Sequence, residues 1–399
     1  MNFKELIRKT TSCVDFGTRE QALTSVKAWF GESYTLYVTD GENYLQCLED
    51  IYDADKLIAE RFSRETIYKF INKRVAEIKL SGEEFNQELN DFFKFFYSIT
   101  PKTISVVAPI SGIRLDGGAR SFDLSIFRFG HLADLSLPIA NQDGMYVSVG
   151  ISEIYDNTIA IAKAEVAFLD FARLVVFFSG KLDQSIRIRT GLPLYVDLSH
   201  EQMYVNTSSY QILDKAGNPE SSSFTNKHFE KIPINNDFFR ANEQFGKLWS
   251  LYETRHKGGK LTDIESRILN CALALGESAM TSDTRNSIIY TCISLEILLS
   301  FDEGSLFQKS IGEKLSDLFS FIVAKDRDSR LFVGKLLKKV YGMRSAIVHG
   351  GEKKLSNENL SINMLVRAGI NDLLNGDRFV NVTKISQLYE QLKIAQNSY

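Results

Sequence analysis

The chain has few cysteines, and none of them form a close pair. Its 399 residues contain four cysteines with no CxxC motif: Cys13, Cys47, Cys271 and Cys292. Disulfide scaffolds and cysteine-rich zinc sites need closely and regularly spaced cysteines, so both classes are disfavoured. Scattered thiols are typical of a reducing compartment, and we therefore expect a cytoplasmic protein.

Long hydrophobic runs are also missing. The first twelve residues, MNFKELIRKTTS, lack the apolar core of a signal peptide. The most apolar long stretch, residues 159–178, carries four charged residues: Lys163, Glu165, Asp170 and Arg173. A bilayer span tolerates few charges, so this stretch predicts a helix packed within the protein and no membrane partner.

The sequence lacks the common motifs of several enzyme classes. It contains no GxxxxGK[ST], no HExxH and no GxSxG, so nucleotide hydrolysis by a P-loop, zinc proteolysis and α/β-hydrolase chemistry are not indicated. The five histidines lie far apart in sequence: His131, His200, His228, His256 and His349. We expect neither a metal nor a cofactor.

The remaining composition predicts a soluble α+β protein of two or three domains. Hydrophobic residues make up 44% and charged residues 24% of the chain, which is ordinary for globular proteins. Residues 1–100 read as a mixed α/β region, with a helix over 83–97. Residues 101–235 read as a β-rich region with one inserted helix near 159–178 and a polar linker or long loop at 214–223. Residues 236–399 read as an all-α domain.

Seven helices are expected in the last region, joined by short loops as in an antiparallel bundle. Capping-box patterns begin two of them, at Thr262–Glu265 and Ser305–Gln308. The expected ranges are 236–256, 263–280, 285–300, 306–324, 329–349, 358–375 and 383–396.

The helix expected over 329–349 carries the residues best suited to chemistry. Leu336, Val340, Met343 and Ile347 recur at three- to four-residue spacing and predict its buried stripe. Gly350 and Gly351 then supply the positive φ that ends a helix, which places His349 in the last turn. Arg344 lies five residues earlier.

An arginine and a histidine together suit the cutting of RNA without metal. The fork-shaped guanidinium of Arg344 grips a phosphate oxygen, and the imidazole of His349 moves a proton near neutral pH. These functions suffice for attack of an RNA 2′-hydroxyl on its own 3′-phosphate, a reaction that DNA cannot undergo.

The charge around this pair is locally positive although the whole chain has a net charge of −3. From residue 335 to residue 354 the sequence has six basic residues and one acidic residue, Glu352. The residues expected to contact RNA are Lys338, Lys339, Ser345, Lys353 and Lys354. The other interpretation of such a run is an ordinary solvated face.

Helical geometry separates the two side chains. Five residues span about 500° of rotation, so Arg344 and His349 point about 140° apart and lie about 7.5 Å apart along the axis. A histidine that frays from the helix end, or two copies that meet across a two-fold axis, would bring them together. A homodimer is therefore part of the hypothesis, and its alternative is an arginine and a histidine with no shared role.

The segment RSAIVHG at 344–350 resembles the R-x(4–6)-H motif of HEPN domains, in particular the Apea-like HEPN group, whose motif runs into HG. The upstream segment IIYTCISLEILL at 288–299 is similar to the Leu-Glu-x-Leu helix of that group. The resemblance covers about residues 240–396 and does not extend to residues 1–235.

The resemblance implies a homodimeric helical bundle with metal-independent endoribonuclease activity of the toxin–antitoxin, antiphage or RNA-processing kind. Its catalytic residues carry over to Arg344 and His349. Glu296 is a third candidate, because its carboxylate could orient Arg344, although a purely structural glutamate is equally compatible. Ser345 stands where many HEPN nucleases have asparagine, aspartate or histidine.

Under this hypothesis the protein is a defence or stress effector that cuts RNA. Residues 1–235 would sense a trigger or choose the substrate, with a phage-derived or neighbouring-gene product as regulator. Two alternatives stay open. One is a catalytically inactive HEPN module for dimerisation or nucleotide binding, and the other is a carbohydrate- or peptide-binding β domain with a helical dimerisation region.

Overall fold

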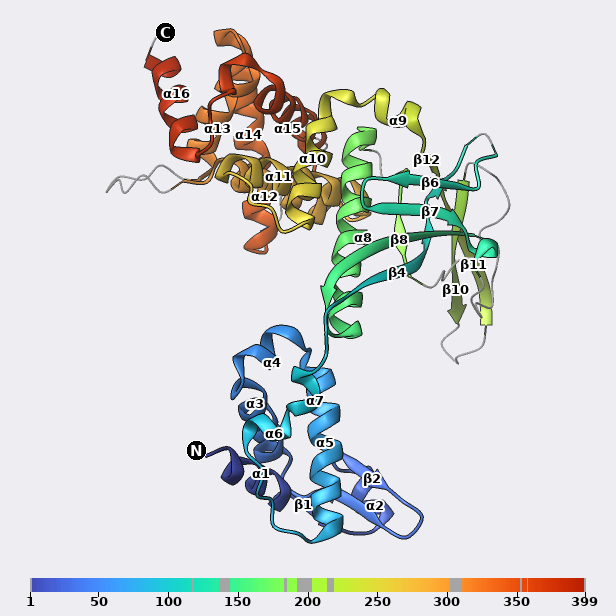
Figure 1. The fold of residues 1–399 in the computed structure, drawn as a ribbon. Coiled ribbons are helices and arrows are strands. Elements are labelled where there is room, and N and C mark those ends of the chain that lie inside the picture. The colour runs from blue at the N-terminus through green and yellow to red at the C-terminus, as the bar shows by residue number, and fades with distance from the viewer. Residues whose placement is uncertain are drawn as a thin grey trace. The chain divides into compact units, whose positions relative to one another are not determined.

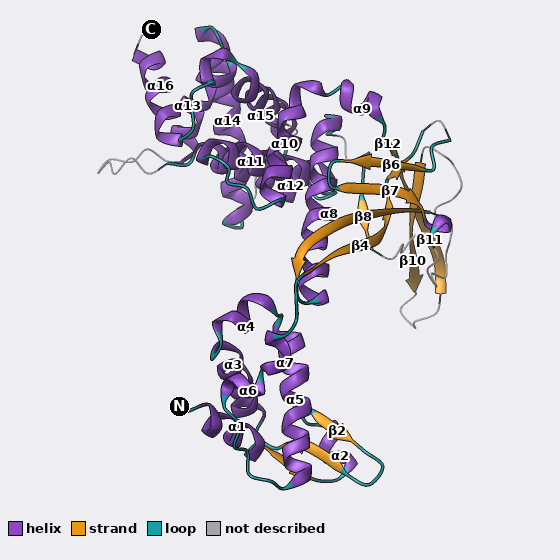
Figure 2. Ribbon diagram, in the orientation of Figure 1, coloured by secondary structure: helices purple, strands orange, loops and turns teal. Residues whose placement is uncertain are grey.

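The computed structural model describes residues 2–116, 118–135, 144–182, 185–191, 203–213, 219–301, 311–351, 354–356 and 358–397. The chain has an α+β layout, with its sheets in the N-terminal half and helices throughout the C-terminal part (Figures 1 and 2). It divides into two compact units. Unit 1 comprises residues 1–106 and 150–165, and unit 2 comprises residues 107–149 and 166–399.

Unit 1 packs helices around a small antiparallel sheet with the strand order β1-β3-β2. Its elements are α1 (Phe3–Ser12), β1 (Val14–Phe16), α2 (Arg19–Leu23), β2 (Ala28–Phe30), β3 (Thr35–Val38), α3 (Gly41–Asp53), α4 (Lys56–Arg61), α5 (Arg64–Ser81), α6 (Leu89–Phe92) and α7 (Lys94–Tyr97).

The single helix predicted over residues 83–97 is wrong. Gly82 ends α5 with a φ of 67°, and only the one-turn helices α6 and α7 follow. The aromatic side chains of this segment decide the conformation, because Phe92, Phe93 and Phe96 are all buried, and Phe93 packs edge-to-face against both of the others. Their burial in the core of unit 1 outweighs local helix propensity.

Five strands form the main sheet, in the order β6-β7-β8-β4-β9, and α8 follows the strand β8 in sequence. The elements of this region are β4 (Lys102–Ser111), β5 (Ile113–Arg114), β6 (Ser121–Leu124), β7 (Phe127–His131), η1 (Leu132–Asp134), β8 (Met145–Ile154), α8 (Asn157–Ser179), β9 (Arg189–Thr190), β10 (Met203–Leu213), β11 (Pro219–Glu230) and β12 (Ile232–Pro233). The helix expected near 159–178 is thus confirmed as α8.

The polar stretch 214–223 is not simply a linker. Its second half belongs to β11, where Ser221, Ser222 and Ser223 pair with Ile212, Gln211 and Tyr210 of β10 in an antiparallel hairpin. Residues 214–218 lie outside the described residues. The part of this stretch over residues 219–223 was therefore predicted wrongly as loop, because the ladder of backbone hydrogen bonds continues further than its polar side chains suggest.

The C-terminal part of unit 2 is helical, as predicted. Its elements are α9 (Asn236–Arg240), η2 (Glu243–Phe245), α10 (Gly246–His256), α11 (Asp263–Met280), α12 (Thr284–Leu299), α13 (Ile311–Val323), α14 (Arg327–Val348), α15 (Glu358–Asn375), η3 (Asp377–Phe379) and α16 (Ile385–Asn397). The helix predicted over 236–256 is divided into α9, η2 and α10. The capping box expected at Ser305–Gln308 lies outside the described residues. No described helix combines the length and the apolar character that a membrane span requires.

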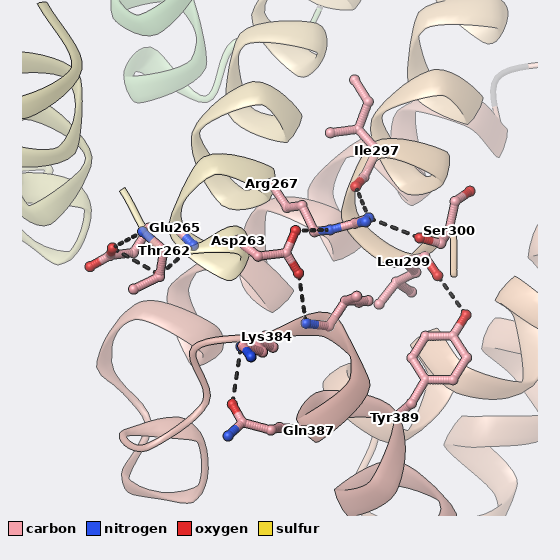
Figure 3. A network of polar contacts seen from close by, with 11 residues as sticks. Thr262, Asp263, Glu265, Arg267, Ile297, Leu299, Ser300, Lys384, Gln387 and Tyr389 are labelled. Carbon is pink, nitrogen blue, oxygen red and sulfur yellow. Dashed lines mark hydrogen bonds and ion pairs between the residues drawn. The ribbon is translucent and has the colours of Figure 1, made fainter. Parts of the chain in front are cut away.

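Polar contacts join the start of α11 to the C-terminal end of α12 and to the N-terminal end of α16 (Figure 3). Asp263 accepts hydrogen bonds from the Ile385 backbone N–H at 2.8 Å and from Nε of Arg267 at 2.9 Å. Arg267 also donates to the carbonyls of Ile297 and Ser300, both at 2.9 Å. Burial alone would raise the pKa of Asp263, but these donors hold it below its ordinary value. Thr262 begins α11 with the predicted capping box.

Helices α8 and α11 lie close together at Gly276. A Cβ atom on this residue would lie 2.1 Å from the carbonyl oxygen of Arg173 in α8, and backbone atoms cannot give way as a flexible side chain can. We therefore expect Gly276→Ala to lower the free energy of unfolding by about 3 kcal/mol, the upper part of the usual range for overpacking. Urea unfolding followed by circular dichroism would measure this loss.

Gly246→Ala is the matched control, since a Cβ atom there meets no atom within 4 Å and the residue begins α10. We expect it to be neutral or to stabilise the fold by up to about 1 kcal/mol. Equal effects of the two substitutions would contradict the close approach.

Candidate functional site

The end of α14 is built as the sequence predicts. Its last residue is Val348, and His349 is the C-cap, whose backbone N–H donates to the carbonyl of Ser345. Gly350 follows with a φ of 71°, and the N–H of Gly351 donates to the carbonyl of Ala346 at 2.8 Å. These bonds satisfy the final carbonyls of the helix and fix the position of His349.

The buried face of α14 sets the direction of its polar side chains. Val333, Leu337, Val340 and Met343 are buried. Leu336 and Ile347, which the spacing also assigned to the buried stripe, are only half-buried. Helix α14 contacts α12, α13 and α15. Arg344, on the flank of this face, is therefore directed towards α12.

Arg344 meets Glu296 of α12. Its Nη2 atom lies 3.4 Å from Oε1 and 3.5 Å from Oε2 of Glu296, and the two side chains are 34% and 22% exposed. Nε of Arg344 and Oε1 of Glu296 are buried without a hydrogen-bond partner among the described residues. The ion pair is thus long for a charge-assisted contact, and its guanidinium keeps an unused donor.

Tyr341 and Cys292 surround this ion pair, and the sequence interpretation missed both. Burial raises the pKa of Cys292 to about 12, and the nearby charge of Glu296 acts in the same direction. Burial likewise raises the pKa of Tyr341, whose hydroxyl donates to the Cys292 carbonyl at 3.4 Å. Both groups are neutral near pH 7, so neither is an activated nucleophile. Helical spacing could have identified them, because Tyr341 lies three residues before Arg344 and Cys292 lies four residues before Glu296.

His349 belongs to a different face of α14. It is exposed, and none of the described residues forms a hydrogen bond with its ring. On an α-helix, Lys338 and Ser345 point within about 40° of His349, whereas Arg344 points about 140° away. Lys338 and Ser345 are exposed too. The structure therefore brings Arg344 to Glu296. His349 lies on the same face of α14 as Ser345 and Lys338, and Lys338 is about 16 Å away along the helix axis. The two sets are not joined in one chain.

The other predicted RNA-binding lysines differ in their surroundings. Lys339 forms an ion pair with Glu358 at the start of α15, and its hydrogen bond holds the pKa of Glu358 below its ordinary value. Its charge is therefore engaged within the chain. Lys354 is exposed. Lys353 and the neighbouring Glu352 lie outside the described residues.

Among the described residues there is no group of three or more His, Cys, Asp or Glu side chains that could hold a metal ion. The four cysteines are buried free thiols. Comparison of the chain with protein-family models, with curated proteins and with solved structures finds no match. The resemblance of α12 and α14 to a HEPN domain therefore stays a prediction.

Proposed function

We propose that this protein is a cytoplasmic, homodimeric endoribonuclease of the HEPN type that cuts RNA without metal. One observation carries the proposal. Arg344, whose side chain is 34% exposed, lies beside Glu296, and the same helix ends at His349, whose imidazole is exposed. The reaction needs two groups: a cation that binds the phosphate and a side chain that transfers a proton.

The proposed reaction is an internal transesterification. His349 removes the proton of the 2′-hydroxyl, and the 2′-oxygen forms a bond to phosphorus while the bond to the 5′-oxygen breaks. The 5′-oxygen takes up a proton, so the products are a 2′,3′-cyclic phosphate and a 5′-hydroxyl. Arg344 stabilises the negative charge that grows on the phosphate oxygens, and Glu296 positions Arg344.

The separation of Arg344 from His349 along α14 makes a composite site part of this proposal. A second copy of the chain, with its own α14 facing the first, would bring two arginines and two histidines to one cleft. Exposed Lys338, Ser345 and Lys354 would then line the path of the RNA, whose phosphates attract positive charge.

The chemistry is tested with purified protein, a defined RNA and EDTA. We expect fragments that end in a 2′,3′-cyclic phosphate and begin with a 5′-hydroxyl. The matched substrate carries a single 2′-deoxy nucleotide at the cleaved position and should stay intact. Cleavage that requires added metal, or that proceeds at the deoxy position, would contradict the mechanism.

A role as an antiphage or stress effector, controlled through residues 1–235 by a phage-derived or neighbouring-gene product, rests on family analogy alone. The competing candidate is a catalytically inactive module, and the pairing of Arg344 with Glu296 away from His349 favours it. Expression toxicity distinguishes them. An inactive module should be no more toxic than its Arg344→Ala variant, whereas the nuclease should be clearly more toxic.

A further inference from the structure

Unit 2 contains a cavity that no part of the proposed nuclease site uses. It lies between the end of α8, the 3₁₀ turn η2 and α15, and its volume is about 390 Å³. That volume is within the range of pockets that hold small molecules. None of the described residues that line it belongs to α12 or α14, and none of these described residues is acidic. We call it the α8–α15 cavity.

Arg367 provides a fixed positive charge in its wall. Nε donates to the carbonyl of Phe177 at 3.2 Å, and Nη2 donates to the carbonyl of Phe178 at 2.8 Å. The guanidinium also lies 4.6 Å from the centre of the Phe245 ring. The last turn of α8 and this ring therefore hold the guanidinium in one orientation.

One nitrogen of Arg367 remains for a ligand. Nη1 forms no hydrogen bond with a described residue, and it lies beside Gly180, whose φ is 66°. A Cβ atom at Gly180 would come within 2.9 Å of Nη1. Gly180 therefore has two roles. Its positive φ ends α8, and its lack of a side chain leaves Nη1 of Arg367 uncovered.

Two asparagines supply neutral hydrogen-bonding groups. Asn363 is only 3% exposed, and its Nδ2 donates to Oγ of Ser278 at 3.4 Å. Its Oδ1 accepts from no described residue. Asn371 is arranged in the opposite sense, since its Oδ1 accepts from Asn375 at 3.0 Å and its Nδ2 donates to no described residue. The cavity therefore offers a cationic donor, a neutral donor and a neutral acceptor.

We propose that the α8–α15 cavity binds a small organic anion. A carboxylate or phosphate group contacts Nη1 of Arg367, and an N–H or O–H group of the same molecule donates to Oδ1 of Asn363. A short apolar part lies against Phe245 and Met364. None of the described lining residues is a carboxylate, and the positive charge of Arg367 repels a cationic ligand, so the described wall favours an anion.

Isothermal titration calorimetry of the full chain tests the proposal, with two anionic ligands that are each compared with a neutral counterpart. N-acetyl-leucine and adenosine monophosphate represent the carboxylate and phosphate sources, and N-acetyl-leucine amide and adenosine are their neutral counterparts. We expect at least one charged probe to bind with a Kd below about 1 mM, and its neutral counterpart to bind at least about tenfold more weakly.

Variants locate the binding. Met364 is 64% exposed at the edge of the cavity, so Met364→Trp fills the space without disturbing the core, and we expect it to weaken binding by more than about tenfold. Ser361→Trp, on the same helix but outside the lining, should bind as the unaltered protein does. The proposal is overturned if no probe binds, if charged and neutral probes bind equally, or if Met364→Trp retains the affinity. These outcomes do not depend on RNA cleavage.

Discussion

Replacement of His349 by alanine is expected to slow RNA cleavage by about 10²–10⁴-fold, the usual contribution of a positioned acid or base. The ring is exposed at the C-cap of α14 and receives no hydrogen bond from a described residue, so its loss removes chemistry and little packing. Single-turnover rates in EDTA measure the effect, and a thermal unfolding curve that matches the unaltered protein excludes a folding defect.

Val348→Ala is the appropriate control, because Val348 is exposed at the same helix end and carries no ionisable group. Its cleavage rate should stay within about twofold. Arg344→Ala should slow cleavage by about 10²–10³-fold, since it removes the group that stabilises the phosphate charge. A His349→Ala protein that cuts RNA at the original rate would remove the basis of the mechanism.

The second large effect concerns an ion pair between a buried aspartate of α8 and a partly exposed arginine of α10. Nη2 of Arg255 lies 2.8 Å from Oδ2 of Asp170, whose side chain is 11% exposed, and Nη1 of Arg255 donates to Asn270. Among the described residues, Arg255→Met leaves Asp170 with Arg173 as its one remaining cation, at 3.6 Å. Asp170 is buried and would keep its more distant cation, while the 35% exposure of Arg255 weakens the lost interaction, so we expect the free energy of unfolding to fall by about 2 kcal/mol.

This loss should depend on pH. Burial already raises the pKa of Asp170, although Arg255 and Arg173 oppose the increase, so removal of Arg255 raises this pKa further. In the folded variant the ionised carboxylate is less stable than in the unfolded chain. The free energy of unfolding of the variant therefore falls as the pH rises from the unfolded pKa of Asp170, about 3.9, through its higher folded pKa. The difference from the unaltered protein is therefore smallest near pH 4 and largest near pH 7.

Urea unfolding at these two pH values measures the effect. Arg240→Met, which removes an exposed ion pair with Asp237, should change stability by less than about 0.5 kcal/mol at either pH. If Asp170→Asn is added to the Arg255→Met variant, the loss of stability relative to the unaltered protein should no longer grow between pH 4 and pH 7. A loss that is the same at pH 4 and pH 7 would contradict the burial of an ionised Asp170.

The sequence was most informative where structure is decided locally. The capping box at Thr262 and the glycine at position 350 mark the start of α11 and the end of α14. Apolar residues at helical spacing then predicted α11, α12 and α15 within one or two residues of their observed bounds. Caps and periodicity act over a few residues, so a single sequence contains them.

Prediction from the sequence failed where contacts between residues far apart in the chain decide the structure. The segment over residues 83–97 breaks into short turns because its aromatic rings enter a core that other elements build. The contacts of Arg367 with Phe177 and Phe178 join residues about 190 positions apart, so no local pattern indicates the α8–α15 cavity. The contact between Arg344 and Glu296 was anticipated only through the family resemblance, and its catalytic role stays a prediction.

The attachment of α8 to the helices that follow has a consequence for how this gene can recombine. Asp170, Arg173 and the carbonyl of Phe178 are bonded to Arg255, Glu277 and Arg367, respectively. An exchange that moved only the coding sequence after residue 236 would separate all three pairs and leave Gly276 facing no helix. Natural shuffling of the helical region should therefore carry α8 along with it.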